Sequence, residues 1–163
     1  MWSAACDLYH HIFPGLMPGC RKENYGLDEF EAGYDKFLGV DVLLTFKNGM
    51  VLTLQEKFLT TRYDTVTVEY YNDPQTKAPG DWFELKAQLY FVGYWNRTDP
   101  DAGFRKWILL SWPQMVLQTQ LGNIPWQRRG NSRSNAKADF KYVKFDDVPR
   151  CCVIASSLDS QQR

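Results

Sequence analysis

Three polar side chains near the middle of the chain have types and a spacing that suit metal-assisted chemistry. Asp41 begins an apolar stretch directly after Gly39 and Val40, and Gln55 and Lys57 lie two residues apart in the next apolar stretch. A carboxylate and an amide oxygen on one face form a hard oxygen site that suits Mg²⁺ or Mn²⁺. A lysine beside them can orient an attacking water or neutralise charge that builds on a phosphate. Phosphodiester hydrolysis needs these same groups.

Two strands joined by a tight turn are expected to position these side chains. Residues 40–46 are mostly β-branched or apolar, and residues 50–59 alternate in character. Between them stands Asn48-Gly49, and Asn-Gly is the strongest short signal for a hairpin. The sequence therefore predicts a β-hairpin over 40–59.

The register of this hairpin decides whether the three side chains can meet. Gln55 and Lys57 point to one face of their strand because side chains alternate along it. The turn predicts that Asp41 lies opposite Glu56 or one of its neighbours. Asp41 then lies beside Gln55 and Lys57, provided that its side chain points to their face. Glu56 points the other way, toward a helix or solvent.

Two short segments resemble the motif of the PD-(D/E)XK nuclease superfamily, the restriction-endonuclease-like proteins. They are Gly39-Val40-Asp41 at the start of a strand and Gln55-Glu56-Lys57 in the middle of the next. The resemblance covers roughly residues 29–60. It implies that Asp41 is the motif aspartate and Lys57 the motif lysine. Gln55 stands where most members have Asp or Glu, and this Gln-x-Lys variant is known in some endonucleases of the superfamily, including transposon-encoded ones.

The same resemblance implies a further acidic residue from the first core helix. Glu29, Glu31 and Asp35 are the candidates in the acidic stretch upstream, and Glu31 is favoured as the third metal ligand. Glu69, on a strand expected over 65–71, is a further candidate. The expected cofactor is Mg²⁺ or Mn²⁺, held by Asp41, Gln55 and Glu31.

A basic segment near the C-terminus is the candidate nucleic-acid-binding region. Its residues can contact phosphates from a loop beside a strand, although a solvated loop explains them equally well. Nearby Trp126 either stacks on a base or is a rim aromatic. The predicted contacts are Arg128, Arg129, Arg133 and Lys137, followed by Lys141 and Lys144.

Each candidate site residue also has an ordinary structural interpretation. An Asp at a strand start, such as Asp41, is often a turn or cap residue. A single Lys on an exposed strand face, such as Lys57, often protects a sheet edge or adds solubility. The catalytic interpretation therefore depends on the three residues taken together.

The composition bounds the class of protein. A chain of 163 residues with 44% apolar residues suits a single globular domain over 1–163. The net charge is zero, so any affinity for nucleic acid must come from a local basic patch. The four cysteines form no CxxC pair, which disfavours structural zinc and indicates reduced thiols in a cytoplasmic protein. No signal peptide or membrane-spanning run is present in the sequence, so no membrane partner is expected.

Helical and strand patterns are mixed along the chain. Besides the hairpin, they predict strands near 65–71, 104–112 and 140–145, helices near 3–13 and 113–121, and a segment 82–95 that starts as a helix and ends as a strand. Residues 128–138 are expected to form a loop. The pattern predicts an α+β (or α/β) fold with a central mixed β-sheet flanked by helices, which the resemblance further describes as a restriction-endonuclease-like core.

The leading hypothesis is a metal-dependent endonuclease, a hydrolase that binds DNA and cleaves its phosphodiester bonds. The alternative is a non-catalytic nucleic-acid-binding or assembly module on the same fold, and Gln55 and the neutral charge are its best support. A structural protein that oligomerises through its aromatic residues is a third option, and a homodimer is left open.

Overall fold

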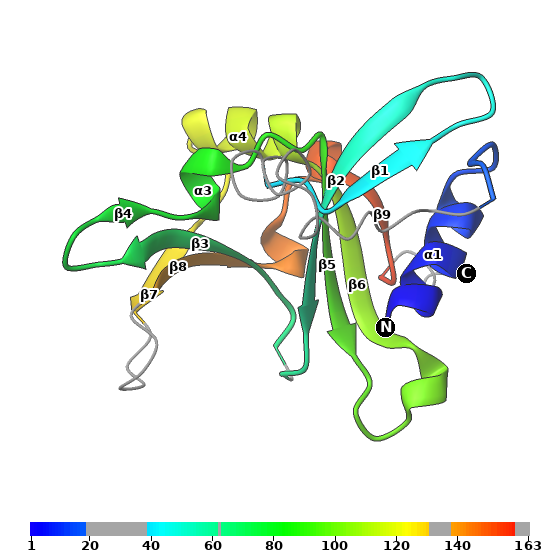
Figure 1. Cartoon of the computed structure of the whole chain (residues 1–163). Coiled ribbons are helices and arrows are strands. Elements are labelled where there is room, and N and C mark those ends of the chain that lie inside the picture. The colour runs from blue at the N-terminus through cyan, green and yellow to red at the C-terminus, as the bar shows by residue number, and fades with distance from the viewer. Residues whose placement is uncertain (19–38, 62, 131–137, 159–163) are drawn as a thin grey trace.

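The computed structural model describes residues 1–18, 39–61, 63–130 and 138–158 of the chain. Three α-helices lie in these ranges: α1 (Trp2–Ile12), α3 (Asp81–Glu84) and α4 (Trp112–Gln120). Short 3₁₀ helices span Pro100–Ala102, Phe145–Asp147 and Arg150–Cys152. The described strands form two sheets (Figure 1). None of the described helices is both long and apolar enough to cross a membrane.

The first sheet is central and mixed, as predicted. Within the described residues its strand order is β1-β2-β5-β6-β9, and only the β2–β5 pair is parallel. The strand bounds are β1 Val42–Thr45, β2 Val51–Leu59, β5 Leu89–Trp95, β6 Phe104–Ser111 and β9 Val153–Ser156. The expected α+β class is therefore confirmed.

The β1–β2 hairpin is confirmed, and its register lies within the predicted range. Gly49 has a φ of 82°, a left-handed conformation that favours glycine, and the Met50 amide donates to Asn48 Oδ1 over 3.0 Å. Val42 lies opposite Leu54. This register brings Asp41, the residue before β1, level with Gln55, a neighbour of Glu56.

The second sheet has the order β4-β3-β8-β7 within the described residues. Its strands are β3 Thr65–Asp73, β4 Ala78–Pro79, β7 Gln127–Gly130 and β8 Asp139–Lys144. The prediction of a loop over residues 128–138 is wrong at its start, because Arg128 and Arg129 lie in β7. This strand has no apolar side chain and is exposed throughout, so no hydrophobic alternation marks it.

The edge of β3 abuts the face of the first sheet. The Tyr90 hydroxyl donates to the Thr67 carbonyl over 2.8 Å, and the Tyr94 hydroxyl donates to the Thr65 carbonyl over 2.7 Å. Both tyrosines belong to β5. Their hydroxyl groups donate to backbone carbonyls of β3 that do not pair with β4, because β4 pairs only with the end of β3. Unpaired strand edges are costly when buried, and here hydroxyl groups pair them.

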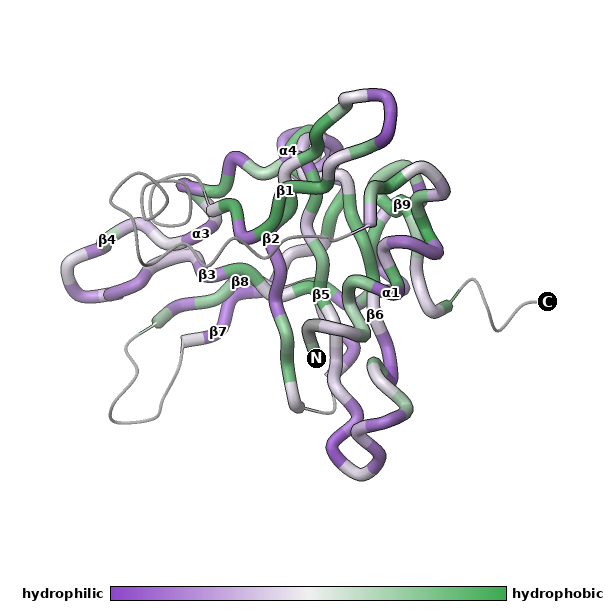
Figure 2. Tube along the Cα trace, turned by 45° about the vertical axis from the view of Figure 1, so that its right-hand side comes forward, coloured by the Kyte–Doolittle hydropathy of each residue, from purple (hydrophilic) through white to green (hydrophobic). Residues whose placement is uncertain are grey.

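Two hydrophobic clusters lie on the two faces of the first sheet. Tyr9 of α1 packs with Leu54, Phe91 and Leu109 on one face. The other face packs against the second sheet and α4 through residues that include Tyr90, Val68 and Met115. Figure 2 shows the hydrophobic segments gathered along the central strands, while the β3–β4 turn and the β5–β6 loop are hydrophilic.

Candidate active site

Asp41 is attached to β2 on both sides of Gln55. The Asp41 amide donates to the Leu54 carbonyl over 2.9 Å, and the Glu56 amide donates to Asp41 Oδ2 over 2.8 Å. The carboxylate thus supplies an acceptor where the regular ladder of β1 has ended. Asp41 has the cap role that its structural interpretation anticipated, and this role also holds its carboxylate beside Gln55.

Gln55 carries an unsatisfied acceptor. Its Oε1 is buried and accepts no hydrogen bond from the described part of the chain. Leaving a buried amide oxygen unpaired costs about 1–3 kcal/mol, and such an atom in a native protein calls for a water or an ion as its partner. Gly39, with a φ of 56°, lies close by: a Cβ placed there would lie 2.9 Å from Leu85 Cδ1 and 3.5 Å from Gln55 Oε1. A side chain at position 39 would therefore clash with Leu85 and would be in ordinary contact with this oxygen.

Lys57 lies on the same strand face as Gln55, as predicted, and reaches toward the second sheet. Its Nζ lies 3.9 Å from Asp81 Oδ2 and 5.5 Å from the centre of the Phe140 ring. Its side chain is 23% exposed, so the ammonium group is largely buried and does not lie at an open sheet edge. The region around Asp41, Gln55 and Lys57 is called the corner. Glu56 points the opposite way, as expected, and accepts a hydrogen bond from the Tyr9 hydroxyl of α1 over 2.6 Å.

Two further carboxylates lie at this corner. Burial raises the pKa of Glu69, Asp81 raises it further, and Lys57 lowers it. Beneath them, burial and then the charges of Asp81 and Asp41 raise the pKa of Tyr90 well above its ordinary value. The carboxylates of Asp41, Glu69 and Asp81 come from three separate segments and place negative charge around Tyr90. Lys57 offsets part of this charge.

Asp81 is the residue of this corner that the sequence did not single out. It follows Gly80 in a Pro-Gly-Asp turn, and the pattern indicates only a loop and the start of a helix there. The contact with Lys57 joins positions 24 residues apart in the chain. No local spacing marks it.

The predicted third metal ligand cannot be placed. Glu31, like Glu29 and Asp35, lies outside the described residues. In the ranges that the structure describes, no group of three or more His, Cys, Asp or Glu side chains is arranged to hold a metal ion. A cation at this corner would therefore need an amide or backbone oxygen in addition to carboxylates, and Gln55 Oε1 is a buried oxygen without a hydrogen-bond partner among the described residues.

The predicted basic patch is divided by the pleat of β7. Arg128 lies opposite Lys141, forms an ion pair with Asp139, and stacks with its guanidinium 4.3 Å from the centre of the Tyr70 ring. Arg129 lies opposite Phe140, the ring that Lys57 approaches. Because neighbouring residues of a strand point to opposite faces, Arg129 shares the face of the candidate site and Arg128 does not. Arg133 and Lys137 lie outside the described residues.

Trp126 is half-buried and packs against the hydrophobic core. Its indole N–H donates to Thr119 Oγ1 over 2.8 Å, and its ring packs edge-on against Trp82 at 5.2 Å between centroids. These contacts agree with the rim-aromatic interpretation.

Comparisons with protein-family models, with curated proteins and with solved structures gave no match.

Proposed function

We propose that this chain is a metal-dependent endonuclease that hydrolyses DNA phosphodiester bonds at the corner formed by Asp41, Gln55 and Lys57. One observation carries the proposal: the carboxylate of Asp41 is tied to the backbone beside Gln55, whose buried Oε1 has no partner in the described residues. Lys57 lies two residues further along the same face. The resemblance to the PD-(D/E)XK superfamily supports the same assignment.

The donor set suits a hard divalent cation. A carboxylate oxygen and a neutral amide oxygen are donors that Mg²⁺ and Mn²⁺ accept, and an unpaired buried acceptor gains a partner when the ion binds. Asp41 and Gln55 would hold the ion, and Glu31 remains the proposed third ligand. When bound, Mg²⁺ polarises a phosphate oxygen and lowers the pKa of a water.

Lys57 is the proposed catalytic cation. The separation of 3.9 Å from Asp81 is long for a direct charged hydrogen bond, so Asp81 steers the ammonium group without saturating it. The remaining N–H groups of Lys57 can donate to a phosphate oxygen and stabilise the charge that builds there. They can also orient the attacking water.

Arg129 is the proposed contact to the DNA backbone within the described residues. It is exposed, and its register with Phe140 places it on the site face of the second sheet. Arg128, Arg133 and Lys137 stay in the proposal as more distant phosphate contacts. A cytoplasmic location belongs to the same proposal and depends on the cysteine pattern.

A cleavage assay on plasmid and on single-stranded circular DNA, with Mg²⁺ or Mn²⁺, tests this function. Asp41→Ala and Lys57→Ala should abolish cleavage while circular dichroism shows a folded protein. Lys47→Ala removes an exposed lysine from the β1–β2 turn and is the matched control. Cleavage by Lys57→Ala at the wild-type rate would refute the assignment of the site.

A non-catalytic nucleic-acid-binding module on the same fold is the second candidate. It is favoured by the hydrogen bond from the Glu56 amide to Asp41, which gives the carboxylate a structural role without any metal. The response to metal separates the two candidates. An enzyme with this site gains thermal stability when Mn²⁺ binds, because a ligand of the folded state stabilises it, and the module does not.

A further inference from the structure

A second polar region lies beyond the C-terminal end of β2. It is a pocket of about 590 Å³ between the β2–β3 connection and the β5–β6 loop. Its size is within the range of small-molecule sites. The residues that line it include Thr60, Thr61, Trp95, Arg97, Thr98 and Arg105.

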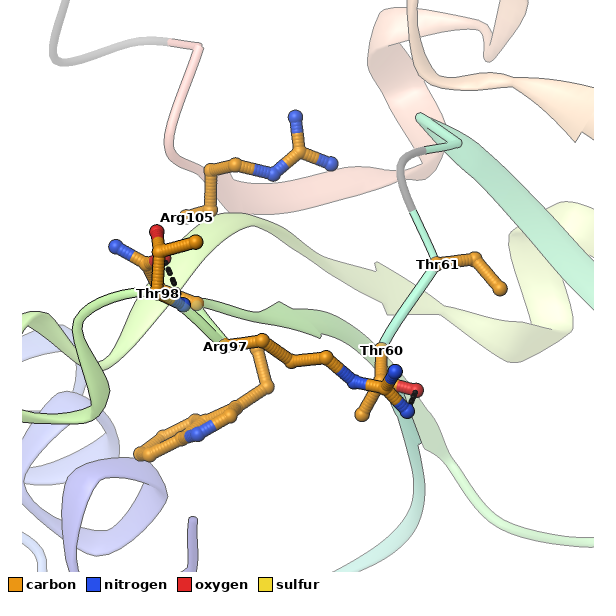
Figure 3. Close-up of a pocket in the computed structure, with 7 residues that line it drawn as sticks. Thr60, Thr61, Arg97, Thr98 and Arg105 are labelled. Carbon is orange, nitrogen blue, oxygen red and sulfur yellow. Dashed lines mark hydrogen bonds between the residues drawn. The ribbon is translucent and has the colours of Figure 1, made fainter.

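The charged side chains that line this pocket are both arginines. Figure 3 shows the guanidinium groups of Arg97 and Arg105 on opposite sides of the space. Arg97 Nη2 donates to Thr60 Oγ1 over 2.7 Å, which holds the guanidinium in place without neutralising it. A guanidinium has five N–H donors, so one bond to a hydroxyl leaves most of them for another acceptor.

The carboxylate that faces Arg105 already has a stronger partner. Arg105 Nη2 lies 3.6 Å from Asp64 Oδ1, whereas Lys106 Nζ donates to Asp64 Oδ2 over 2.6 Å. One carboxylate therefore faces two cations, and Lys106 takes the closer contact. The pocket keeps an excess of positive charge even when Asp64 is counted.

Hydrogen bonds within the β5–β6 loop hold the wall that carries Arg97. Asn96 Oδ1 accepts from the Thr98 hydroxyl over 2.9 Å and from the amides of Thr98 and Asp99 over 3.2 and 3.3 Å. The turn on both sides of Arg97 is thus tied down by its own side chains. The arginine extends from a defined loop, so little ordering is required before it can bind.

We propose that this pocket is an anion site that binds a phosphate group. Guanidinium groups match the tetrahedral oxygens of phosphate with paired donors, and the hydroxyls of Thr60 and Thr61 add neutral donors around them. The phosphate can belong to inorganic phosphate, to a nucleotide whose base lies near Trp95, or to a polynucleotide backbone. The site does not depend on the proposed nuclease activity, although Thr60 lies roughly 10 Å beyond Lys57, three residues along the chain.

Titration of the ¹⁵N-labelled protein followed by NMR tests the proposal. The probes are inorganic phosphate, a nucleoside 5′-monophosphate, a single-stranded oligonucleotide and an acidic peptide without phosphate, all at constant ionic strength. We expect the phosphate probes to shift the backbone amides of residues 60–61 and 95–98 in a saturable manner. Arg97→Gln and Arg105→Gln should each weaken binding by about tenfold or more, and Arg150→Gln, an exposed arginine outside the pocket, should leave it unchanged.

Thr61→Val removes one exposed hydroxyl with little change of shape, and it should weaken binding by about two- to fivefold. This variant keeps the test valid if an arginine variant fails to fold. Equal affinity for the three phosphate probes assigns recognition to the phosphate group alone. Tighter binding of the mononucleotide that is lost in Trp95→Leu, or tighter binding of the oligonucleotide, identifies the source.

Three outcomes would overturn the phosphate site: shifts of these amides by none of the phosphate probes, equal phosphate binding by wild type and both arginine variants, or tighter binding of the acidic peptide. Because the Lys57→Ala protein keeps this pocket, loss of cleavage with retained phosphate binding separates the two proposals.

Discussion

The polar side chains on the two faces of β2 differ in how far they are paired within the protein. On the face covered by α1, Glu56 accepts a hydrogen bond from the Tyr9 hydroxyl over 2.6 Å and lies beside close-packed aromatic rings. On the other face, Gln55 Oε1 has no partner in the described part of the chain, and Lys57 has a carboxylate only at 3.9 Å. Glu56 and Gln55, which are neighbours on one strand, thus differ in whether their side-chain oxygens have a hydrogen-bond partner in the described residues. The face with unsatisfied and loosely paired groups is the one at which we propose that a ligand binds.

The largest expected effect is on the α1 face. Phe91 is fully buried and packs edge-on against Tyr9, with 5.5 Å between the ring centroids. Phe91→Ala should lower the free energy of unfolding by about 3–5 kcal/mol, measured by urea denaturation, because it leaves a cavity. Leu117→Ala, at a side chain that is 44% exposed, should change it by less than about 0.5 kcal/mol. A similar small loss for Phe91→Ala would mean that the α1 face is not close-packed.

The next effect separates charge from hydrogen bonding at Asp41. Asp41→Asn keeps an oxygen that can accept from the Glu56 amide and removes the negative charge. Cleavage of plasmid DNA should fall by about a hundredfold or more, while the melting temperature stays near that of wild type. Asp7→Asn, on the exposed surface of α1, is the matched control. Unchanged cleavage would leave Asp41 with a structural role alone.

A smaller effect is expected for the hydroxyl that satisfies Glu56. Tyr9→Phe removes the donor and leaves the ring, so the free energy of unfolding should fall by about 1–2 kcal/mol. Cleavage at a temperature where the variant is folded should be unchanged, since Glu56 points away from the site face. Tyr63→Phe, at a side chain that is 60% exposed, serves as the control. Reduced cleavage by folded Tyr9→Phe would show that the two faces are coupled.

The smallest effect is a pH dependence at Glu69. Burial, with the charge of Asp81, raises the pKa of Glu69 above its ordinary value of 4.5. The folded state then binds more protons than the unfolded state, so this group lowers stability as pH rises from about 4.5 through its folded pKa. Glu69→Gln should therefore gain stability relative to wild type over that range, measured by thermal melting at a series of pH values. A difference that does not vary with pH would contradict the raised pKa.

Local pattern was enough to predict most of the strands and the direction of the site side chains. Alternation in residues 50–59 and the Asn48-Gly49 turn predict the hairpin, because both signals lie within a few residues of the structure they specify. The register lies within the predicted range, since Asp41 comes level with Gln55, a neighbour of Glu56. The backbone amide from which the Asp41 carboxylate accepts was not predicted. Side-chain participation in the ladder leaves no mark in the hydrophobic pattern.

Three short strands escaped prediction: β4, β7 and β9. Strand β7 is polar and exposed throughout, and β9 has four residues that follow a 3₁₀ turn. Strand β7 is held in its sheet by backbone pairing with β8, whereas β9 pairs with the distant β6 and packs Val153 against the core. The patch predicted from Arg128 and Arg129 was consequently treated as one surface, whereas the pleat divides it between two.

The sequence by itself determined that Gln55 and Lys57 share a face and that Glu56 points away, because side-chain alternation is a property of any strand. Only the tertiary structure decided which groups meet them. Asp81, Glu69 and Phe140 come to Lys57 from three separate segments, and the arginine pocket joins the ends of three strands. Both clusters bring together residues that are far apart in the chain, and no local spacing in the sequence specifies such contacts.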